Sequence, residues 1–221
     1  MSVLVKICGI NSVETADAAV RAGADFAGLV FHARSPRHLA PEQASSLAAR
    51  MRGKLRLVAM LVDPVDEMIG AAVKAVQPDL IQLHGAETPA RVAAIRARFG
   101  VPVLKVIAIA EPSDFASVAA HEDAADMLMF DAKPPPGAAR EGGLGAVFDW
   151  QMLRGRKFAR PWLLAGGLNA DNVARAIRLT EAPGVDVSSG VETAPGVKSA
   201  DLIVQFTAAA KAARYATESR A

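Results

Sequence analysis

The sequence lacks the features that mark secreted and membrane-spanning proteins. It contains one cysteine, so an intramolecular disulfide is excluded. No basic N-terminal region precedes a long apolar run, as in a signal peptide, and no segment stays apolar over the roughly 20 residues that span a bilayer. We therefore expect a soluble, cytoplasmic protein that does not associate with membranes.

The sequence also lacks a strong excess of charge of either sign. Its 25 Lys and Arg residues nearly balance its 23 Asp and Glu residues, giving a net charge of +2. The basic residues form no dense block interleaved with aromatic residues, which make up only 5% of the chain, so we expect no nucleic-acid surface. Hydrophobic residues make up 52% of the 221, and the composition does not shift along the chain, which favours a single domain over residues 1–221.

What the sequence does contain is a regular alternation of strand-like and helical segments. Residues 3–8 are apolar and β-branched and end at the single cysteine, Cys8, after which Gly9 favours a turn into a loop. Residues 11–15 then resemble a helix start, with a capping residue and an acid in the first turn. Seven more strands are predicted at residues 25–31, 55–62, 80–85, 103–108, 126–131, 162–165 and 185–190.

Helical segments are predicted between most of these strands. They lie at residues 65–76, 88–99, 111–120, 150–154, 169–179 and 199–213, and a further helix opens at Pro41. Parallel strands need such crossovers, and eight of them favour closure into an α/β fold of the (β/α)8 TIM-barrel type over the alternative, an open doubly wound sheet. Residues 132–145 interrupt the pattern with proline and glycine, as functional loops do.

Two glycine-containing segments at the strand ends predict a phosphate site. Gly166 and Gly167 follow the seventh predicted strand, and Ser189 and Gly190 end the eighth. Barrels often hold phosphate in the loops after these two strands, on backbone N–H groups and a nearby helix N-terminus. The alternative is that these glycines only form tight turns.

Cys8 and Asp131 are the candidates for acid–base chemistry, because both end apolar strands where a barrel keeps its active site. A Cys8 thiolate would serve as a base if a positive charge lay nearby; the alternative is a small buried hydrophobic side chain. Asp131 would serve as the acid, or else cap its own loop. Lys6 shares a strand face with Cys8, so we expect it to point inward and to pair with Asp186 on the adjacent eighth strand.

Seven motifs together resemble phosphoribosylanthranilate isomerase of tryptophan biosynthesis. They run in family order over nearly the whole chain. They are Lys6-Ile7-Cys8-Gly9-Ile10, Ser35-Pro36-Arg37, Gln82-Leu83-His84-Gly85, Phe130-Asp131-Ala132-Lys133, Phe148-Asp149-Trp150, Ala165-Gly166-Gly167-Leu168-Asn169 and Val185-Asp186-Val187-Ser188-Ser189-Gly190-Val191-Glu192. The resemblance implies an Amadori rearrangement of N-(5-phosphoribosyl)anthranilate to 1-(2-carboxyphenylamino)-1-deoxyribulose 5-phosphate. It implies a small phosphoribosyl substrate and no metal or organic cofactor.

The resemblance also assigns roles to residues. Cys8 would be the general base and Asp131 the general acid, while Arg37 would pair with the anthranilate carboxylate. His84 and Asp186 match family residues of the substrate site. The sequence departs from the family pattern at Leu144, where Thr or Ser is usual, and at Ala132, where Thr is common.

Three other hypotheses about the function are less favoured. Indole-glycerol-phosphate synthase would carry several catalytic Lys and Glu residues at strand ends, and an epimerase would carry paired aspartates or metal-binding histidines. A phosphate-binding barrel without activity would leave Cys8 and Asp131 replaceable. The sequence leaves open whether the protein is a monomer or a homodimer and whether a related substrate of histidine biosynthesis is accepted.

Overall fold

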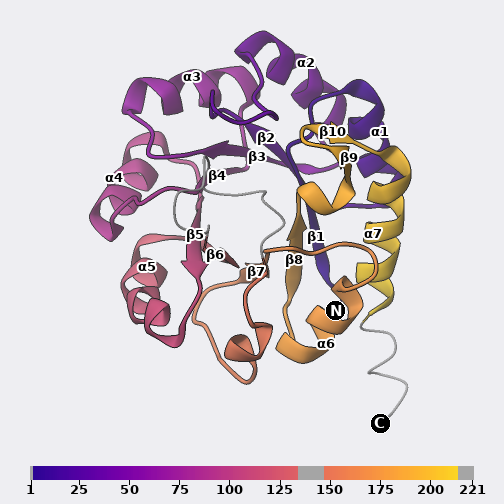
Figure 1. Ribbon diagram of the computed structural model, residues 1–221. Coiled ribbons are helices and arrows are strands. Elements are labelled where there is room, and N and C mark those ends of the chain that lie inside the picture. The colour runs from indigo at the N-terminus through magenta and orange to yellow at the C-terminus, as the bar shows by residue number, and fades with distance from the viewer. Residues whose placement is uncertain (1, 134–146, 214–221) are drawn as a thin grey trace.

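The computed structural model describes residues 2–133 and 147–213. Eight parallel strands form a closed barrel in chain order, with β1 hydrogen-bonded to β8, and helices surround it (Figure 1). The strands are β1 (Leu4–Cys8), β2 (Phe26–Val30), β3 (Arg56–Leu61), β4 (Leu80–Leu83), β5 (Val103–Ile109), β6 (Met127–Ala132), β7 (Trp162–Leu164) and β8 (Gly184–Val187). The predicted (β/α)8 fold is confirmed.

Most of the predicted helices are present. They are α1 (Val13–Ala22), α2 (Pro41–Met51), α3 (Asp66–Val76), α4 (Pro89–Phe99), α5 (Val118–Ala124), α6 (Val173–Thr180) and α7 (Ala200–Ala212), with 3-10 turns η1 (Pro112–Ser117), η2 (Trp150–Leu153) and η3 (Ser189–Val191). Their ends follow local chemistry: Ser12 caps α1 by accepting from the N–H of Thr15, and Gly23 ends it at φ 73°. Helix α7 lies beside α1, which completes the outer ring where β8 meets β1 (Figure 1).

Along each strand, the side chains point alternately into the interior of the barrel and outward to the surrounding helices. The interior cluster includes Phe26, Val58, Leu104, Met129 and Leu163, all buried, whereas the intervening strand residues pack against the helices in a larger cluster. The same alternation places Lys6 and Cys8 on the inner face with Leu4, and it places Asp131 there with Met127 and Met129. The polar residues of the inner face therefore collect toward the carboxyl ends of the strands.

Several elements differ from the prediction. The eighth strand, predicted at residues 185–190, ends at Val187, and Ser189 and Gly190 lie in the 3-10 turn η3 instead. The segment predicted as one helix at residues 111–120 is divided into η1 and α5, because Asp114 accepts from the N–H groups of Ala110 and Glu111 and fixes a tight turn. Helix α6 begins four residues later than predicted, since Asn169 accepts from the N–H groups of Asp171 and Asn172. A hairpin of β9 (Glu192–Ala194) and β10 (Val197–Lys198), which no pattern predicted, precedes α7.

Candidate active site

A buried ion pair lies beneath the mouth of the barrel on β1 and β8. Lys6 Nζ donates to Asp186 Oδ1 at 2.7 Å, and the Lys6 side chain is fully buried. The two residues are register partners in the β1–β8 pairing, as the predicted alternation requires. The expected contact between Lys6 and Asp186 is therefore confirmed. Burial alone would lower the pKa of Lys6, but Asp186 and the neighbouring Cys8 raise it above its ordinary value.

Cys8 lies at the end of β1, next to this ion pair. Its side chain is only 5% exposed. Space for it comes from Gly28 on β2, where a Cβ would lie 3.0 Å from Cys8 Sγ and 3.2 Å from Lys6 Nζ. Burial raises the pKa of the Cys8 thiol, and the Lys6 ammonium offsets only part of that effect. The thiol is thus predominantly protonated near neutral pH, and a further positive charge would favour its ionisation.

His84 and Asp131 meet on the other side of the barrel mouth. His84 Nε2 lies 3.3 Å from Asp131 Oδ2, and their side chains are 11% and 14% exposed. The other carboxylate oxygen, Oδ1, accepts from the N–H of Ala132 at 2.8 Å. Gly166, with φ 87°, allows the β7 loop to pass closely, because a Cβ there would lie 3.3 Å from Asp131 Oδ1. Two of the predicted site residues are thus brought together, close to the predicted phosphate loop.

The two predicted phosphate segments also lie against each other. A Cβ on Gly190, in η3, would lie only 1.9 Å from the carbonyl oxygen of Leu168 in the loop after β7. Gly166 and Gly167 both adopt positive φ angles, 87° and 64°, which only glycine adopts readily. The loop after β7, which contains Gly166 and Gly167, therefore packs directly against η3, which contains Ser189 and Gly190.

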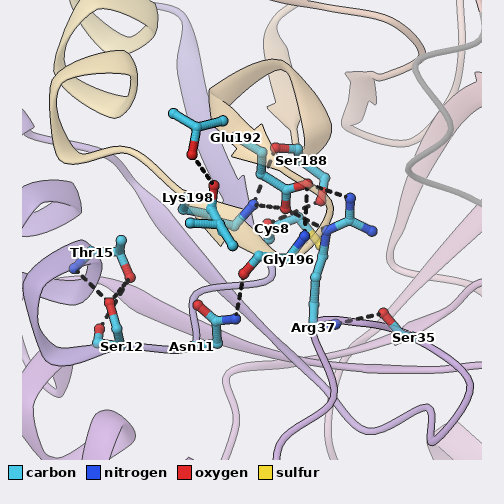
Figure 2. Close-up of polar contacts among 12 residues, drawn as sticks. Cys8, Asn11, Ser12, Thr15, Ser35, Arg37, Ser188, Glu192, Gly196 and Lys198 are labelled. Atoms are coloured by element: carbon cyan, nitrogen blue, oxygen red, sulfur yellow. Dashed lines mark hydrogen bonds and ion pairs between the residues drawn. The ribbon is translucent and has the colours of Figure 1, made fainter.

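Arg37, in the loop after β2, is held by a cluster on the hairpin that follows β8. Its Nε and Nη2 donate to Glu192 Oε1 and Oε2 at 2.6 and 2.7 Å. Lys198 Nζ donates to the same carboxylate at 3.0 Å and to the carbonyl oxygen of Ser188 at 3.1 Å. Figure 2 shows Glu192 lying between the two cations, close to Cys8. We refer to Arg37, Glu192 and Lys198 as the hairpin charge cluster.

The hairpin charge cluster carries one net positive charge. The side chains of Arg37, Glu192 and Lys198 are nearly inaccessible, at 5%, 4% and 0% exposed. Burial would raise the pKa of Glu192, but its bonds to Arg37 and Lys198 bring it below its ordinary value. Burial lowers the pKa of Lys198, and Glu192 offsets part of the shift.

Comparison with known proteins places this chain in a family. Residues 5–209 match the family model of N-(5'-phosphoribosyl)anthranilate (PRA) isomerase. The chain belongs to the PRA isomerase family. A relative from Parvibaculum lavamentivorans, named N-(5'-phosphoribosyl)anthranilate isomerase, is 50% identical over 215 residues, 96% of this chain and 100% of that protein.

Solved structures of PRA isomerases share the fold. The crystal structure of the enzyme from Thermotoga maritima matches with a TM-score of 0.84 at 33% identity, over 95% of this chain and 99% of that one. A second PRA isomerase, crystallised with reduced 1-(o-carboxyphenylamino)-1-deoxyribulose 5-phosphate, matches with a TM-score of 0.81 at 33% identity, over 95% and 99% of the two chains. Both matches span the barrel from end to end.

Sequence reasoning missed several residues that organise the site of this PRA isomerase family member. Glu192 was recognised only as the end of a motif, and Lys198 not at all, although both are buried and charged. A second buried pair, Lys105 and Glu87, stabilises the loop that carries His84: Lys105 Nζ donates to Glu87 at 2.6 Å and to the carbonyl oxygen of Gly85 at 2.7 Å. Each of these four residues is charged but lies in a segment that is otherwise apolar or forms a turn. That pattern was the signal available in the sequence.

Two features are absent from residues 2–133 and 147–213. Within that part of the chain, no group of three or more His, Cys, Asp or Glu side chains is arranged to hold a metal ion. Within the same ranges, no helix has the length and apolar character needed to cross a membrane. The sequence departure at Leu144 lies outside the described residues, whereas Ala132 ends β6 directly after Asp131.

Proposed function

We propose that this protein converts N-(5-phosphoribosyl)anthranilate to 1-(2-carboxyphenylamino)-1-deoxyribulose 5-phosphate, an isomerisation in tryptophan biosynthesis. The observation that carries the proposal is that a chain of the PRA isomerase family places Cys8 and Asp131 on the inner face of its barrel, at the carboxyl ends of β1 and β6. That end of a barrel is where its enzymes carry out chemistry.

Asp131 would supply the acid for the first step. Its protonated carboxyl group would donate to the ring oxygen of the ribose, the bond from that oxygen to C1 would break, and the anilino nitrogen would supply electrons to give a protonated imine. His84, 3.3 Å from Asp131 Oδ2, lies where it can hold the carboxyl group in position and share its proton.

Cys8 would act as the base in the second step. The protonated imine acidifies the proton on C2, and its positive charge favours the thiolate that burial otherwise disfavours. Transfer of the C2 proton to Cys8 Sγ gives an enolamine, which tautomerises to the ketone. We also predict a substrate-site role for Asp186, and its bond to Lys6 suggests that it acts by holding the ammonium beside Cys8.

The two ends of the substrate would bind at two separate places. The anthranilate carboxylate would pair with Arg37, whose side chain lies against Gly9, directly after Cys8, and whose guanidinium makes charge-assisted contacts with carboxylates. The phosphate would lie on the backbone surface of Gly166, Gly167, Ser189 and Gly190, where N–H groups and glycine allow a close approach. The substrate would then span the barrel mouth between Cys8 and Asp131.

A direct assay tests this function. Phosphoribosylanthranilate is fluorescent, and its disappearance on addition of the purified protein measures turnover. We expect saturable loss of fluorescence that the Cys8→Ser and Asp131→Asn variants nearly abolish. If the fluorescence disappeared no faster with the wild-type protein than in the uncatalysed reaction, the proposed function would be refuted.

A further inference from the structure

Gln82, on the inner face of β4, has an amide nitrogen that is hydrogen-bonded and an amide oxygen that has no hydrogen-bond partner within residues 2–133 and 147–213. The residue is fully buried, and Leu80 two positions earlier belongs to the interior cluster, so the Gln82 side chain faces the barrel interior. Gln82 Nε2 lies 3.2 Å from His84 Nδ1, in a hydrogen bond. Gln82 Oε1 is buried and, among the described residues, has no hydrogen-bond partner. Buried polar atoms are normally paired, so this unpaired oxygen calls for a physical reason.

The orientation of the Gln82 amide, with Nε2 toward His84 Nδ1 at 3.2 Å, corresponds to one tautomer of His84. In this orientation the amide nitrogen donates, and His84 Nδ1 accepts as an unprotonated nitrogen. The single proton of the neutral imidazole is then on Nε2, which faces Asp131 Oδ2 at 3.3 Å. In this state the ring donates toward an ionised Asp131, and the His84–Asp131 pair contains one proton.

The opposite orientation of the Gln82 amide fits the His84–Asp131 pair after that pair has taken up a second proton. The second proton comes from solvent water, and it makes the pair either an imidazolium with a carboxylate or a neutral imidazole with a carboxylic acid. The imidazolium carries a proton on Nδ1, and so does the neutral imidazole when the carboxylic acid donates to Nε2; of the two amide atoms only the oxygen can accept that proton. Turning the amide by a half-rotation brings Oε1 to Nδ1 and needs almost no change in shape.

We propose that Gln82 is a positioning residue whose amide reverses with the protonation state of His84, so that the His84–Asp131 pair can hold and release one proton. This inference rests on the proposed function, in which Asp131 donates that proton. The reason for the unpaired oxygen is then clear: in the described part of the chain only His84 bonds the amide, so no second contact fixes it in one orientation.

Other charged groups near His84 are already paired. Around its loop lie Glu87, which bonds Lys105 of β5 at 2.6 Å, and Asp63 after β3, which accepts from the N–H of Ala86 at 2.7 Å. Within the barrel, Lys6 of β1 is bonded to Asp186 of β8. Asp131 is therefore the charged group that the described structure places in contact with the His84 ring.

The first test measures the tautomer directly, without substrate. Nitrogen-15 NMR of the unliganded protein across a pH titration distinguishes Nε2–H from Nδ1–H imidazole. We expect the Nε2–H form in neutral His84 of the wild type, and the Nδ1–H form in Gln82→Glu, because a carboxylate only accepts. Gln82→Met, which forms no such bond, should lose the preference. Wild-type neutral His84 in the Nδ1–H form would overturn the proposal, whether or not the protein turns over substrate.

The second test asks whether the tautomer affects turnover. We expect Gln82→Met to lower kcat about tenfold with KM nearly unchanged, less than the 10²- to 10⁴-fold typical of removing a general acid itself. Gln82→Glu should shift the pH profile of kcat upward together with the His84 titration. The matched control is Thr207→Val, which removes a buried hydroxyl that donates to the carbonyl oxygen of Ile203 within α7 and should leave both profiles unchanged. A Gln82→Met variant with wild-type kcat, tautomer ratio and pH profile would overturn the proposal.

Discussion

Cys8 is subject to two opposing effects, and the stronger one keeps it protonated in the free protein. Burial raises the pKa of its thiol, while the ammonium of Lys6 lowers it by less. A base of this kind becomes effective when the substrate itself supplies a positive charge, as a protonated imine does. The residue is thus suited to a reaction that develops its cation before the base is needed.

The acid and the base should each dominate turnover. We expect Cys8→Ser and Asp131→Asn to lower kcat by about 10² to 10⁴, the usual contribution of a general acid or base. Steady-state kinetics measures the loss, and circular dichroism with thermal unfolding shows whether the fold is intact. Either variant retaining wild-type kcat would remove that residue from its proposed role.

Arg37 should not be replaceable by lysine. Its guanidinium uses two nitrogens at once on Glu192, at 2.6 and 2.7 Å, and a lysine ammonium cannot reproduce that planar arrangement. We expect Arg37→Lys to raise KM about tenfold or more, since a charge-assisted contact is typically worth about 1.5–3 kcal/mol, and Arg37→Ala to raise it further. The control is Arg50→Lys, which breaks the same kind of bidentate pair, with Asp17, on the exposed face of α2. An unchanged KM in Arg37→Ala would exclude Arg37 from the site.

At the scale of elements, the strands were more predictable than the connections that follow them. A strand of this barrel is a short apolar run bounded by turn residues, and that pattern depends only on neighbouring residues. The side-chain alternation then predicted the Lys6–Asp186 contact across 180 residues of chain. The start of α6 and the β9–β10 hairpin depend instead on side-chain hydrogen bonds to the backbone and on contacts with the loop after β2. The local periodicity of the sequence does not indicate either kind of contact.

The difference between strands and connections also explains which site residues could be predicted from the sequence and which could not. Cys8, His84 and Asp131 stand at the ends of strands, and the ends of parallel strands meet at one edge. Glu192 and Arg37 are 155 positions apart and lie in connections, so only the folded chain brings them together. Gln82 lies inside an apolar strand, where its polar side chain was the available but unused signal.

The contact between the β7 loop and η3 should be essential for phosphate binding. A methyl group at residue 190 would lie 1.9 Å from the Leu168 carbonyl oxygen, so Gly190→Ala must separate the two segments. We expect a higher KM for the phosphorylated substrate and weaker competitive inhibition by inorganic phosphate, with a smaller change in kcat.

Gly70→Ala is the matched control for Gly190→Ala. Gly70 lies within α3, and a Cβ there meets no atom closer than 3.9 Å, so alanine should leave KM unchanged and favour the helix. Unchanged phosphate inhibition in Gly190→Ala, measured beside this control, would place the phosphate elsewhere.

At the scale of the whole molecule, Lys6 and Asp186 stabilise the closure of the barrel between its first and last strands. The pair is buried, so removing one partner leaves the other charge without compensation in the interior. We expect Lys6→Met to lower the free energy of unfolding by about 3–5 kcal/mol, measured by urea unfolding. Lys211→Met breaks the partly exposed pair with Asp25 and should cost about 1 kcal/mol or less. Equal losses in the two variants would contradict a special role for the buried pair.

The same pair predicts how stability changes with pH. The pKa values of Lys6 and Cys8 are both raised in the folded protein, so the folded state holds their protons more tightly than the unfolded state. Their contribution is complete below the ordinary thiol pKa of about 8.5, and it is lost as pH rises through the folded-state values. Urea unfolding from pH 7 to pH 11 should therefore show declining stability at the alkaline end. The decline should be smaller in Cys8→Ser, which lacks the buried thiol, and a decline of the same size in both proteins would show that the thiol does not contribute.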